Sequence, residues 1–312
     1  MSESDSGHVL SADQGSVATP AGETFPWLSG QPQPSSVVNC VAYSRSTGLP
    51  VVELPLCDVS EALESDPDLY VWIGLFEPTA DTLAEVQHEF GLHELAIEDA
   101  SREYQRPKLE SYDDCLFVVV RTAQIVDQRG SIDFGTTYFF LGERYLISIR
   151  NGASLSYQTV RKACEHNPAR MKLGPGYVFY TLLDFIVDNY LPITDQLTVY
   201  LGKLENDIFS GKFNRQTLRH LYDLKSELVS LKLAIVPLQE VSGYFTYRKE
   251  DELAINFPAT ALPYFRDVQD HILRTLDAVE AISAMLGVAM DTYLALVGVD
   301  QNEIVKRLAS WA

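Results

Sequence analysis

The pattern of apolar and polar residues divides the chain at about residue 150. Before that point, short runs rich in Val, Ile, Tyr and Phe lie between turn residues, which predicts β-strands. The predicted strands are 37–43, 69–75, 115–126, 136–141 and 145–150, the last two forming a hairpin. Helical spacing predicts two short helices, at 79–90 and at about 93–101. The first half is therefore predicted to be an α/β layer with a mixed sheet.

After residue 150 the apolar positions follow helical spacing. We expect a helix at 154–166 and two long helices, at 177–209 and 214–241. Pro192 should kink the first of these long helices. The glycine loop at 174–176 lacks the Lys-Ser/Thr pair of a phosphate-binding loop, so we interpret it as a turn.

The last pattern predicts one very long helix. Apolar residues recur with helical spacing from Phe265 to Val297, and no proline follows before the chain end. A helix of about 50 residues is about 75 Å long, so it should protrude and pack against copies of itself or a partner. The stretch 282–299 carries one charge, Asp291. A central Asp costs a membrane span ~3 kcal/mol, so we favour an oligomer stalk over a membrane span.

Asp291 itself has two interpretations. It is either a charge on the solvent face, or a member of a carboxylate ring in a water-filled axial cavity of a symmetric bundle. Such a ring would attract cations.

Composition narrows the function classes. The 312 residues suggest about two domains. With 43 Asp and Glu against 24 Lys and Arg, the formal charge is −19, which repels phosphate backbones and argues against nucleic-acid binding. Four scattered cysteines without a CxxC pair indicate reduced thiols in a cytosolic protein. Because no HExxH, phosphate loop or nucleophile–base pair is present, we do not expect an enzyme. Residues 1–36, rich in Ser, Gly and Pro, predict a disordered tail.

Several short motifs occur in the chain in this order: HELAIED at 93–99, QRPKLE at 105–110, YFRDV at 264–268, and Asn302-Glu303-Ile304 with Lys306. With this spacing, the sequence from about residue 37 to 312 resembles the CorA magnesium/cobalt transporter family, and the related ZntB zinc transporters share most of the layout. The resemblance implies an α/β/α sandwich at 37–257, the cytoplasmic funnel domain with two long helices at its end. It also implies a stalk helix at 258–312, and homopentamers.

The resemblance also implies a position at a membrane. The family's Gly-Met-Asn signature, which follows its first membrane helix, is absent here. We therefore expect a portion that stops before the transmembrane segments and lies on the cytoplasmic side of the cell inner membrane, to which those helices would anchor it.

Matching the family position by position suggests metal ligands. Asp99 matches its regulatory-metal aspartate, and Asp267 matches the partner on the stalk of a neighbouring subunit. Glu98 and Asp184 match a second, weaker site, where Tyr104 replaces a histidine of some members. The residues alone favour a structural interpretation, in which Glu98 and Asp99 cap a helix and Asp267 supports a helix start; the resemblance shifts the preference to a metal site. We interpret His271, four residues after Asp267, as a solvated helix histidine.

Four further positions match residues that face the family's pore: Asp291, Asn302, Val305 and Leu308. Val305 stands where some members have methionine, so the hydrophobic contact at the gate should differ.

The expected function is the metal-sensing funnel of a divalent-cation channel. Two carboxylates about 4 Å apart repel by ~4 kcal/mol at an effective dielectric constant of 20, and a Mg²⁺ between them reverses that sign. Mg²⁺ is expected as both regulatory and transported ion, with Co²⁺, Ni²⁺ and Zn²⁺ as alternatives. The other functions left open are a ZntB-like zinc transporter domain and a soluble oligomeric metal-binding scaffold.

Overall fold

The computed structural model describes residues 33–102, 105–127, 129–211, 215–247 and 259–311. Most of the predicted tail and the expected domain boundary near residue 257 lie outside the described residues. At the other boundary, Ser36 is already buried, and its hydroxyl oxygen lies 3.2 Å from that of Thr82. Ser36, which precedes the expected boundary, therefore packs against the body of the described fold.

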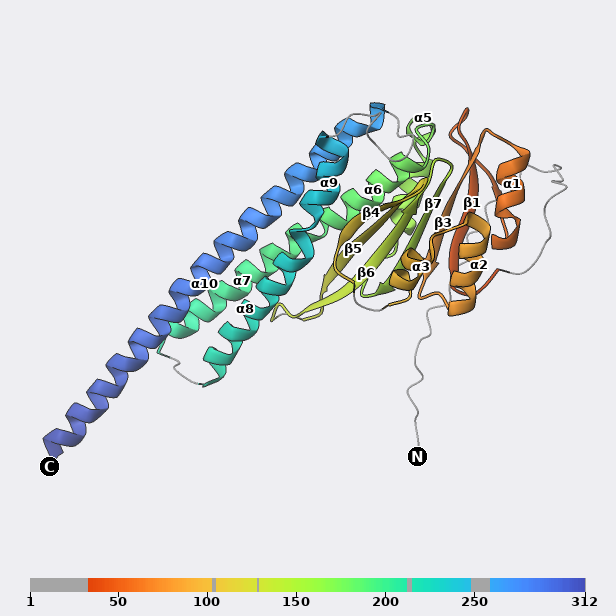
Figure 1. The fold of residues 1–312 in the computed structure, drawn as a ribbon. Helices are drawn as coiled ribbons and strands as arrows, with labels where there is room; N and C mark the ends of the chain where they lie inside the picture. The colour runs from red at the N-terminus through yellow and green to blue at the C-terminus, as the bar shows by residue number, and fades with distance from the viewer. Residues whose placement is uncertain (1–32, 103–104, 128, 212–214, 248–258, 312) are drawn as a thin grey trace, which may run out of the picture.

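The centre of the first half is a seven-stranded sheet in the order β2-β1-β3-β7-β6-β5-β4 (Figure 1). Only β3 and β7 pair in parallel, so the sheet is mixed, as predicted. The strands are β1 (Val37–Ser44), β2 (Pro50–Glu53), β3 (Leu69–Phe76), β4 (Lys108–Tyr112), β5 (Cys115–Ile125), β6 (Ile132–Leu141) and β7 (Tyr145–Gly152). Sequence patterning missed β2 and β4, which are short strands at the two edges.

The sheet is buried on both faces, which explains its nearly continuous apolar strands. In β3, Tyr70 and Trp72 face one hydrophobic cluster, and Val71 and Ile73 face the other. The second cluster includes the helices α1 (Val59–Ser65), α2 (Ala80–Phe90) and α3 (Glu94–Ala100). The first is covered by the C-terminal helices (Figure 1). The fold class is therefore the expected α/β/α arrangement.

The C-terminal layer begins with α4 (Gln158–Glu165), α5 (Pro168–Met171), α6 (Pro175–Asp188) and α7 (Tyr190–Phe209). It continues with α8 (Arg215–Ile235), α9 (Leu238–Tyr247) and α10 (Leu262–Trp311). Two predicted helices are each divided. The first breaks at Asn189 rather than kinking at Pro192, which lies in the first turn of α7, where proline is tolerated. The second is interrupted at Val236 and Pro237.

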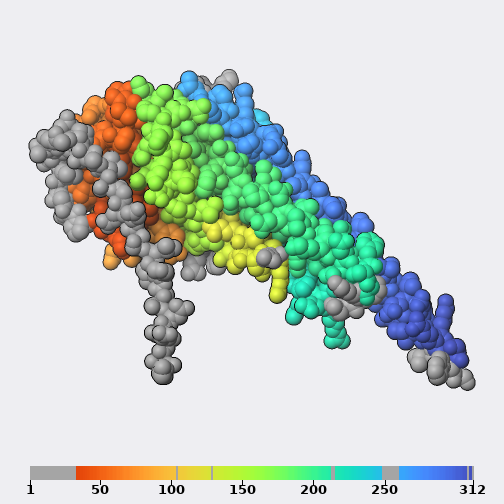
Figure 2. Space-filling view, turned by 180° about the vertical axis from the view of Figure 1, so that it is seen from behind, coloured from red at the N-terminus to blue at the C-terminus, as the bar shows by residue number. Residues whose placement is uncertain are grey.

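Helix α10 is 50 residues long, as its periodicity predicts. One face is buried against the other C-terminal helices, from Phe265 to Tyr293. Beyond Tyr293 none of the described side chains of α10 is buried, and the helix protrudes from the body (Figure 2). Among the described residues, the span Leu262–Arg307 is the one helix long and apolar enough to cross a membrane by length and composition, with a mean hydropathy of 1.7 in its best window.

Candidate metal centre

Two pairs of polar side chains meet where α6 runs beside α10. Asp184 and Asp188 are four residues apart on α6, and Asp267 and His271 are four residues apart on α10. Residues at this spacing lie on the same face of a helix, one turn apart. Each helix therefore presents two potential ligands to the same small space.

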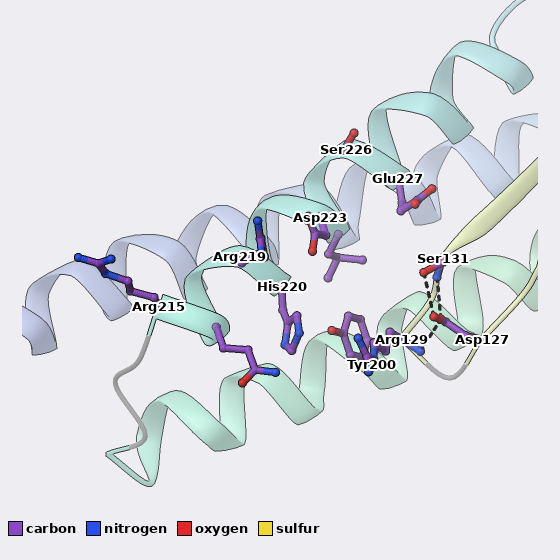
Figure 3. A pocket seen from close by; sticks show the side chains of 12 residues that line it. Asp127, Arg129, Ser131, Tyr200, Arg215, Arg219, His220, Asp223, Ser226 and Glu227 are labelled. Carbon is purple, nitrogen blue, oxygen red and sulfur yellow. Dashed lines mark hydrogen bonds between the residues drawn. The ribbon is translucent and has the colours of Figure 1, made fainter.

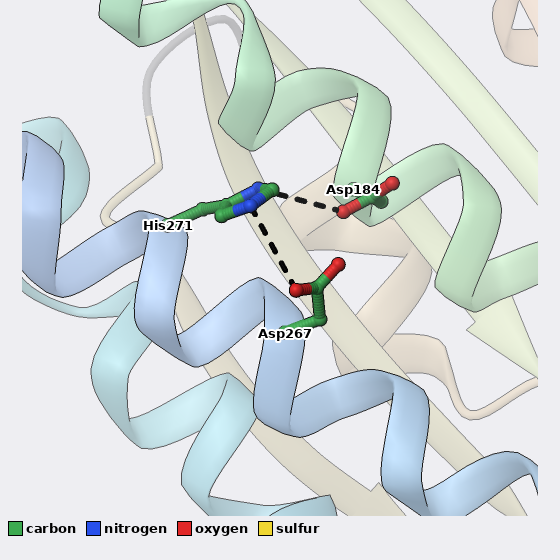
Figure 4. A group of neighbouring side chains, drawn as sticks. All are labelled: Asp184, Asp267 and His271. Carbon is green, nitrogen blue, oxygen red and sulfur yellow. Dashed lines mark ion pairs between the residues drawn. The ribbon is translucent and has the colours of Figure 1, made fainter.

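The distances define a three-residue group. Ligand atoms of Asp184, Asp267 and His271 all lie within 4.8 Å of one another (Figure 4). Nδ1 of His271 is 3.9 Å from Oδ1 of Asp184, and Nε2 is 3.8 Å from Oδ1 of Asp267. The same Nδ1 lies 2.7 Å from Oδ1 of Asp188, so a second carboxylate borders the group.

The group contains two carboxylates and a single imidazole, so negative charge is in excess. The pKa of Asp184 is raised to about 6, first by burial and then by the negative charge of Asp188, while His271 opposes the shift. Oδ1 of Asp184 and Nδ1 of His271 are buried and make no hydrogen bond within the described residues, although Nδ1 lies 2.7 Å from Oδ1 of Asp188. Unpaired buried polar atoms are costly, and a divalent cation among these three residues would pair both.

The donor set restricts which cation fits. Two carboxylates supply the hard oxygen ligands that Mg²⁺ requires, with water completing the shell. The imidazole of His271 is a ligand better suited to Zn²⁺, Co²⁺ or Ni²⁺. The group therefore suits divalent cations as a class.

Asp99 and Glu98 lie elsewhere in the same chain, near the end of α3. Asp99 is 17% exposed; its two oxygens accept hydrogen bonds from Nε2 of Gln105, at 2.9 Å, and Nζ of Lys108, at 2.7 Å. Glu98 is 53% exposed and pairs with Arg102. Neither belongs to the group formed by Asp184, Asp267 and His271.

These placements correct one helix-end interpretation from the sequence. The N-cap of α3 is His93, whose side chain accepts a hydrogen bond from the Leu95 amide. Glu98 and Asp99 lie in the last turn of α3, where the helix dipole disfavours negative charge, so they do not cap its N-terminus. Tyr104, the expected replacement for a family histidine, lies outside the described residues.

The interpretation of His271 as a solvated histidine was wrong. Its side chain is only 21% exposed and is surrounded by carboxylates of α6 and α10. The matching four-residue spacings of Asp184 with Asp188 and of Asp267 with His271 were the available signal. Sequence alone did not reveal that the two helices are neighbours.

Three of the four predicted pore positions share an exposed face of α10. Asp291, Asn302 and Val305 are exposed and belong to a set of exposed residues separated by alternating steps of four and three. This set, called the α10 seam below, comprises Asp277, Ala281, Ala284, Val288, Asp291, Ala295, Gly298, Asn302 and Val305. A seven-residue repeat on one face is typical of helices that pack together. Leu308 lies on the same helix, but its side chain is outside the described part.

A separate pocket of about 840 Å³ lies between the β5–β6 turn and helices α7 and α8 (Figure 3). Its lining mixes cations with carboxylates, and Arg215 points away from the other labelled side chains. We therefore assign no chemistry to it.

Comparison with known proteins places this geometry in context. Residues 68–312 match the sequence model of the family described as CorA-like Mg2+ transporter protein. The chain is 27% identical over 259 residues to the cobalt/magnesium transport protein CorA of Thermotoga maritima, covering 82% of this chain and 72% of that protein.

Solved structures give the same fold. The complete CorA magnesium transporter from Methanocaldococcus jannaschii has a TM-score of 0.70 at 19% identity, covering 87% of this chain and 81% of that one. The ZntB cytoplasmic domain from Vibrio parahaemolyticus has a TM-score of 0.55 at 15% identity, covering 86% of this chain and 98% of that one. At these identities the likeness concerns the fold alone.

Proposed function

The chain belongs to the CorA-like Mg²⁺ transporter family, and from that premise we propose that it is the cytoplasmic metal-sensing funnel of a homopentameric divalent-cation channel. Membership confirms the resemblance found in the sequence. The family comprises metal-ion transporters rather than enzymes, in agreement with the expectation that the chain is not an enzyme. It also counts against a soluble metal-binding scaffold.

The observation that carries the proposal is the group formed by Asp184, Asp267 and His271. Two carboxylates and an imidazole converge there, and two of their buried atoms lack hydrogen-bond partners. In this role Asp267, whose side chain is 63% exposed, also reaches outward to Asp99 of a neighbouring subunit. A Mg²⁺ between those two carboxylates holds the subunits together. When the cation leaves, the carboxylates repel, and the closed state loses its advantage.

The α10 seam supports the ion pathway of the proposal. Its small side chains allow close approach of five helices, while Asp291 and Asn302 place polar groups along the axis. By the family resemblance, Val305 and Leu308 are the apolar positions of the proposed pathway. In this arrangement the funnel lies on the cytoplasmic side of the inner membrane, and Mg²⁺ is both regulator and transported ion. Co²⁺, Ni²⁺ and Zn²⁺ are the alternative cargo.

Limited proteolysis tests the regulatory site. Added Mg²⁺ should protect the chain, and Asp99→Asn and Asp267→Asn should each abolish that protection. Asp270→Asn is the matched control, because Asp270 is an exposed aspartate of the same helix that pairs with Arg274. Unchanged Mg²⁺ protection in both test variants would show that the proposed regulatory site is wrong.

A ZntB-like zinc transporter is the second candidate function. The imidazole in the ligand group favours it, because Zn²⁺ binds nitrogen ligands more readily than Mg²⁺ does. Calorimetry with Zn²⁺ against Mg²⁺ separates the candidates. Tighter Zn²⁺ binding that His271→Ala removes favours the zinc transporter, whereas Mg²⁺ binding that survives His271→Ala favours the magnesium channel.

A further inference from the structure

We propose that Lys108 is a tethered competitor of the divalent cation at Asp99 and sets the cation concentration at which that site fills. This inference rests on the proposed function, in which Asp99 is a metal ligand. It concerns a residue of β4 that lies outside the ligand group of α6 and α10.

The ammonium of Lys108 already contacts the carboxylate of Asp99. Its Nζ lies 2.7 Å from Oδ2 of Asp99, and Nε2 of Gln105 lies 2.9 Å from Oδ1. Both carboxylate oxygens therefore have a donor before any metal arrives. A cation that binds Asp99 through Oδ2 competes with Lys108 for that oxygen and is repelled by its positive charge.

A second carboxylate, that of Glu110, can hold the ammonium of Lys108 when it leaves Asp99. Lys108 and Glu110 are two residues apart on β4, so their side chains leave the same face of the strand. Nζ of Lys108 is 2.6 Å from Oε2 of Glu110, which also accepts a hydrogen bond from the Tyr112 hydroxyl at 2.8 Å. When a metal binds Asp99, the ammonium of Lys108 stays paired with Glu110, so neither Asp99 nor Lys108 is left without an opposite charge.

Lys108 competes effectively with a divalent ion, despite its single charge, because it belongs to the same chain as Asp99. A group held on the same chain acts at a high effective concentration, whatever the concentration of free ions. Its single charge binds Asp99 less strongly than a divalent ion does, so enough Mg²⁺ displaces it. The balance between Asp99 and Glu110 as acceptors for Lys108 then fixes the threshold. In this way the site stays empty at low Mg²⁺ and fills only when Mg²⁺ is abundant.

Two substitutions should move that threshold in opposite directions. Lys108→Met removes the rival, so half-maximal Mg²⁺ protection should need about three- to tenfold less Mg²⁺, the equivalent of one half-buried ion pair. Glu110→Gln weakens the alternative acceptor and holds Lys108 on Asp99, so protection should need more Mg²⁺. A merely structural role for the Lys108 contacts would weaken protection in both variants.

The controls separate charge, folding and site. Lys108→Arg keeps the positive charge and should keep the wild-type threshold. Lys232→Met breaks the 2.9 Å pair with Glu280 on other helices and should leave the threshold unchanged. If Lys108→Met leaves or raises the threshold while Asp99→Asn abolishes protection, the competitor role is overturned and the metal site stands. If Asp99→Asn retains full protection, the proposed function itself fails.

Discussion

At the scale of single residues, Asp184 is the member of the Asp184, Asp267 and His271 group whose pKa is raised. It is held among Asp188, Asp267 and His271 on two packed helices, with little water to stabilise its charge. Burial is the larger cause of its raised pKa, so the ionised form is disfavoured even beside the imidazole. Such a carboxylate gains from a metal, because the cation supplies the missing charge.

This perturbation predicts a pH-dependent stability in metal-free buffer. The folded pKa of about 6 lies above the value of about 3.9 expected in the unfolded chain. Between these values the folded state holds a proton that the unfolded state has released, so stability falls as the pH rises from about 4 to about 6. Asp184→Asn removes this effect. The variant should be more stable than wild type by about 2 kcal/mol at pH 7, and the difference should vanish near pH 4.

Urea unfolding from pH 4 to pH 8 measures this difference. Asp277→Asn, which removes an exposed charge from α10, controls for the change in net charge. A stability difference that stays constant across the pH range would contradict the prediction.

At the scale of elements, α10 presents two different faces. The buried face begins at Phe265, which stacks on Phe245 of α9 at 4.3 Å between ring centroids and on Phe179 of α6 at 6.0 Å. The α10 seam is exposed on the opposite side and makes no comparable aromatic contact with the described residues. The first face holds the helix against its own chain, and the second is the face used in the proposed assembly.

The buried face predicts the effect of a truncation on folding. Phe265→Ala removes a fully buried ring from the three-helix contact, so the free energy of unfolding should fall by about 3–5 kcal/mol. Chemical denaturation of the metal-free chain measures the loss. Arg274→Ala on the exposed side of α10 is the control and should change stability by less than about 0.5 kcal/mol. Equal losses in the two variants would contradict the role of Phe265 as an anchor.

At the scale of the whole molecule, negative charge opposes assembly. A chain of net charge −19 repels its copies. In the proposed function, divalent cations between carboxylates of neighbouring subunits offset this repulsion. Assembly should therefore depend on both the cation and the α10 seam.

Sedimentation analysis tests this dependence. Mg²⁺ should promote a species of about five chains, and removing the metal with a chelator should dissociate it. Val288→Asp places a charge in the seam and should prevent assembly while leaving the unfolding of the single chain unchanged. Assembly that persists in the chelator would contradict the role of the cation. Assembly of the Val288→Asp variant would contradict the role of the α10 seam.

The sequence by itself determined what depends on neighbours along the chain. Periodicity predicted the principal strands, the two short helices and the full length of α10, because each pattern records which side of one element is buried. The family resemblance, which is also read from the sequence, identified Asp99, Asp184 and Asp267 as candidate ligands. The short strand β4 was missed, since five residues of mixed burial carry little periodicity.

Only the tertiary structure decided which distant residues meet. The contact of Asp184 with His271 joins α6 to α10, and the contact of Lys108 with Asp99 joins an edge strand to a helix end. No local pattern encodes these distances, because they depend on how whole elements pack against the sheet. The same packing buries one face of α10 and exposes the seam. The proposed chemistry of the site therefore depends on the fold, because the sequence indicated Asp99, Asp184 and Asp267 but not the part played by His271 or Lys108.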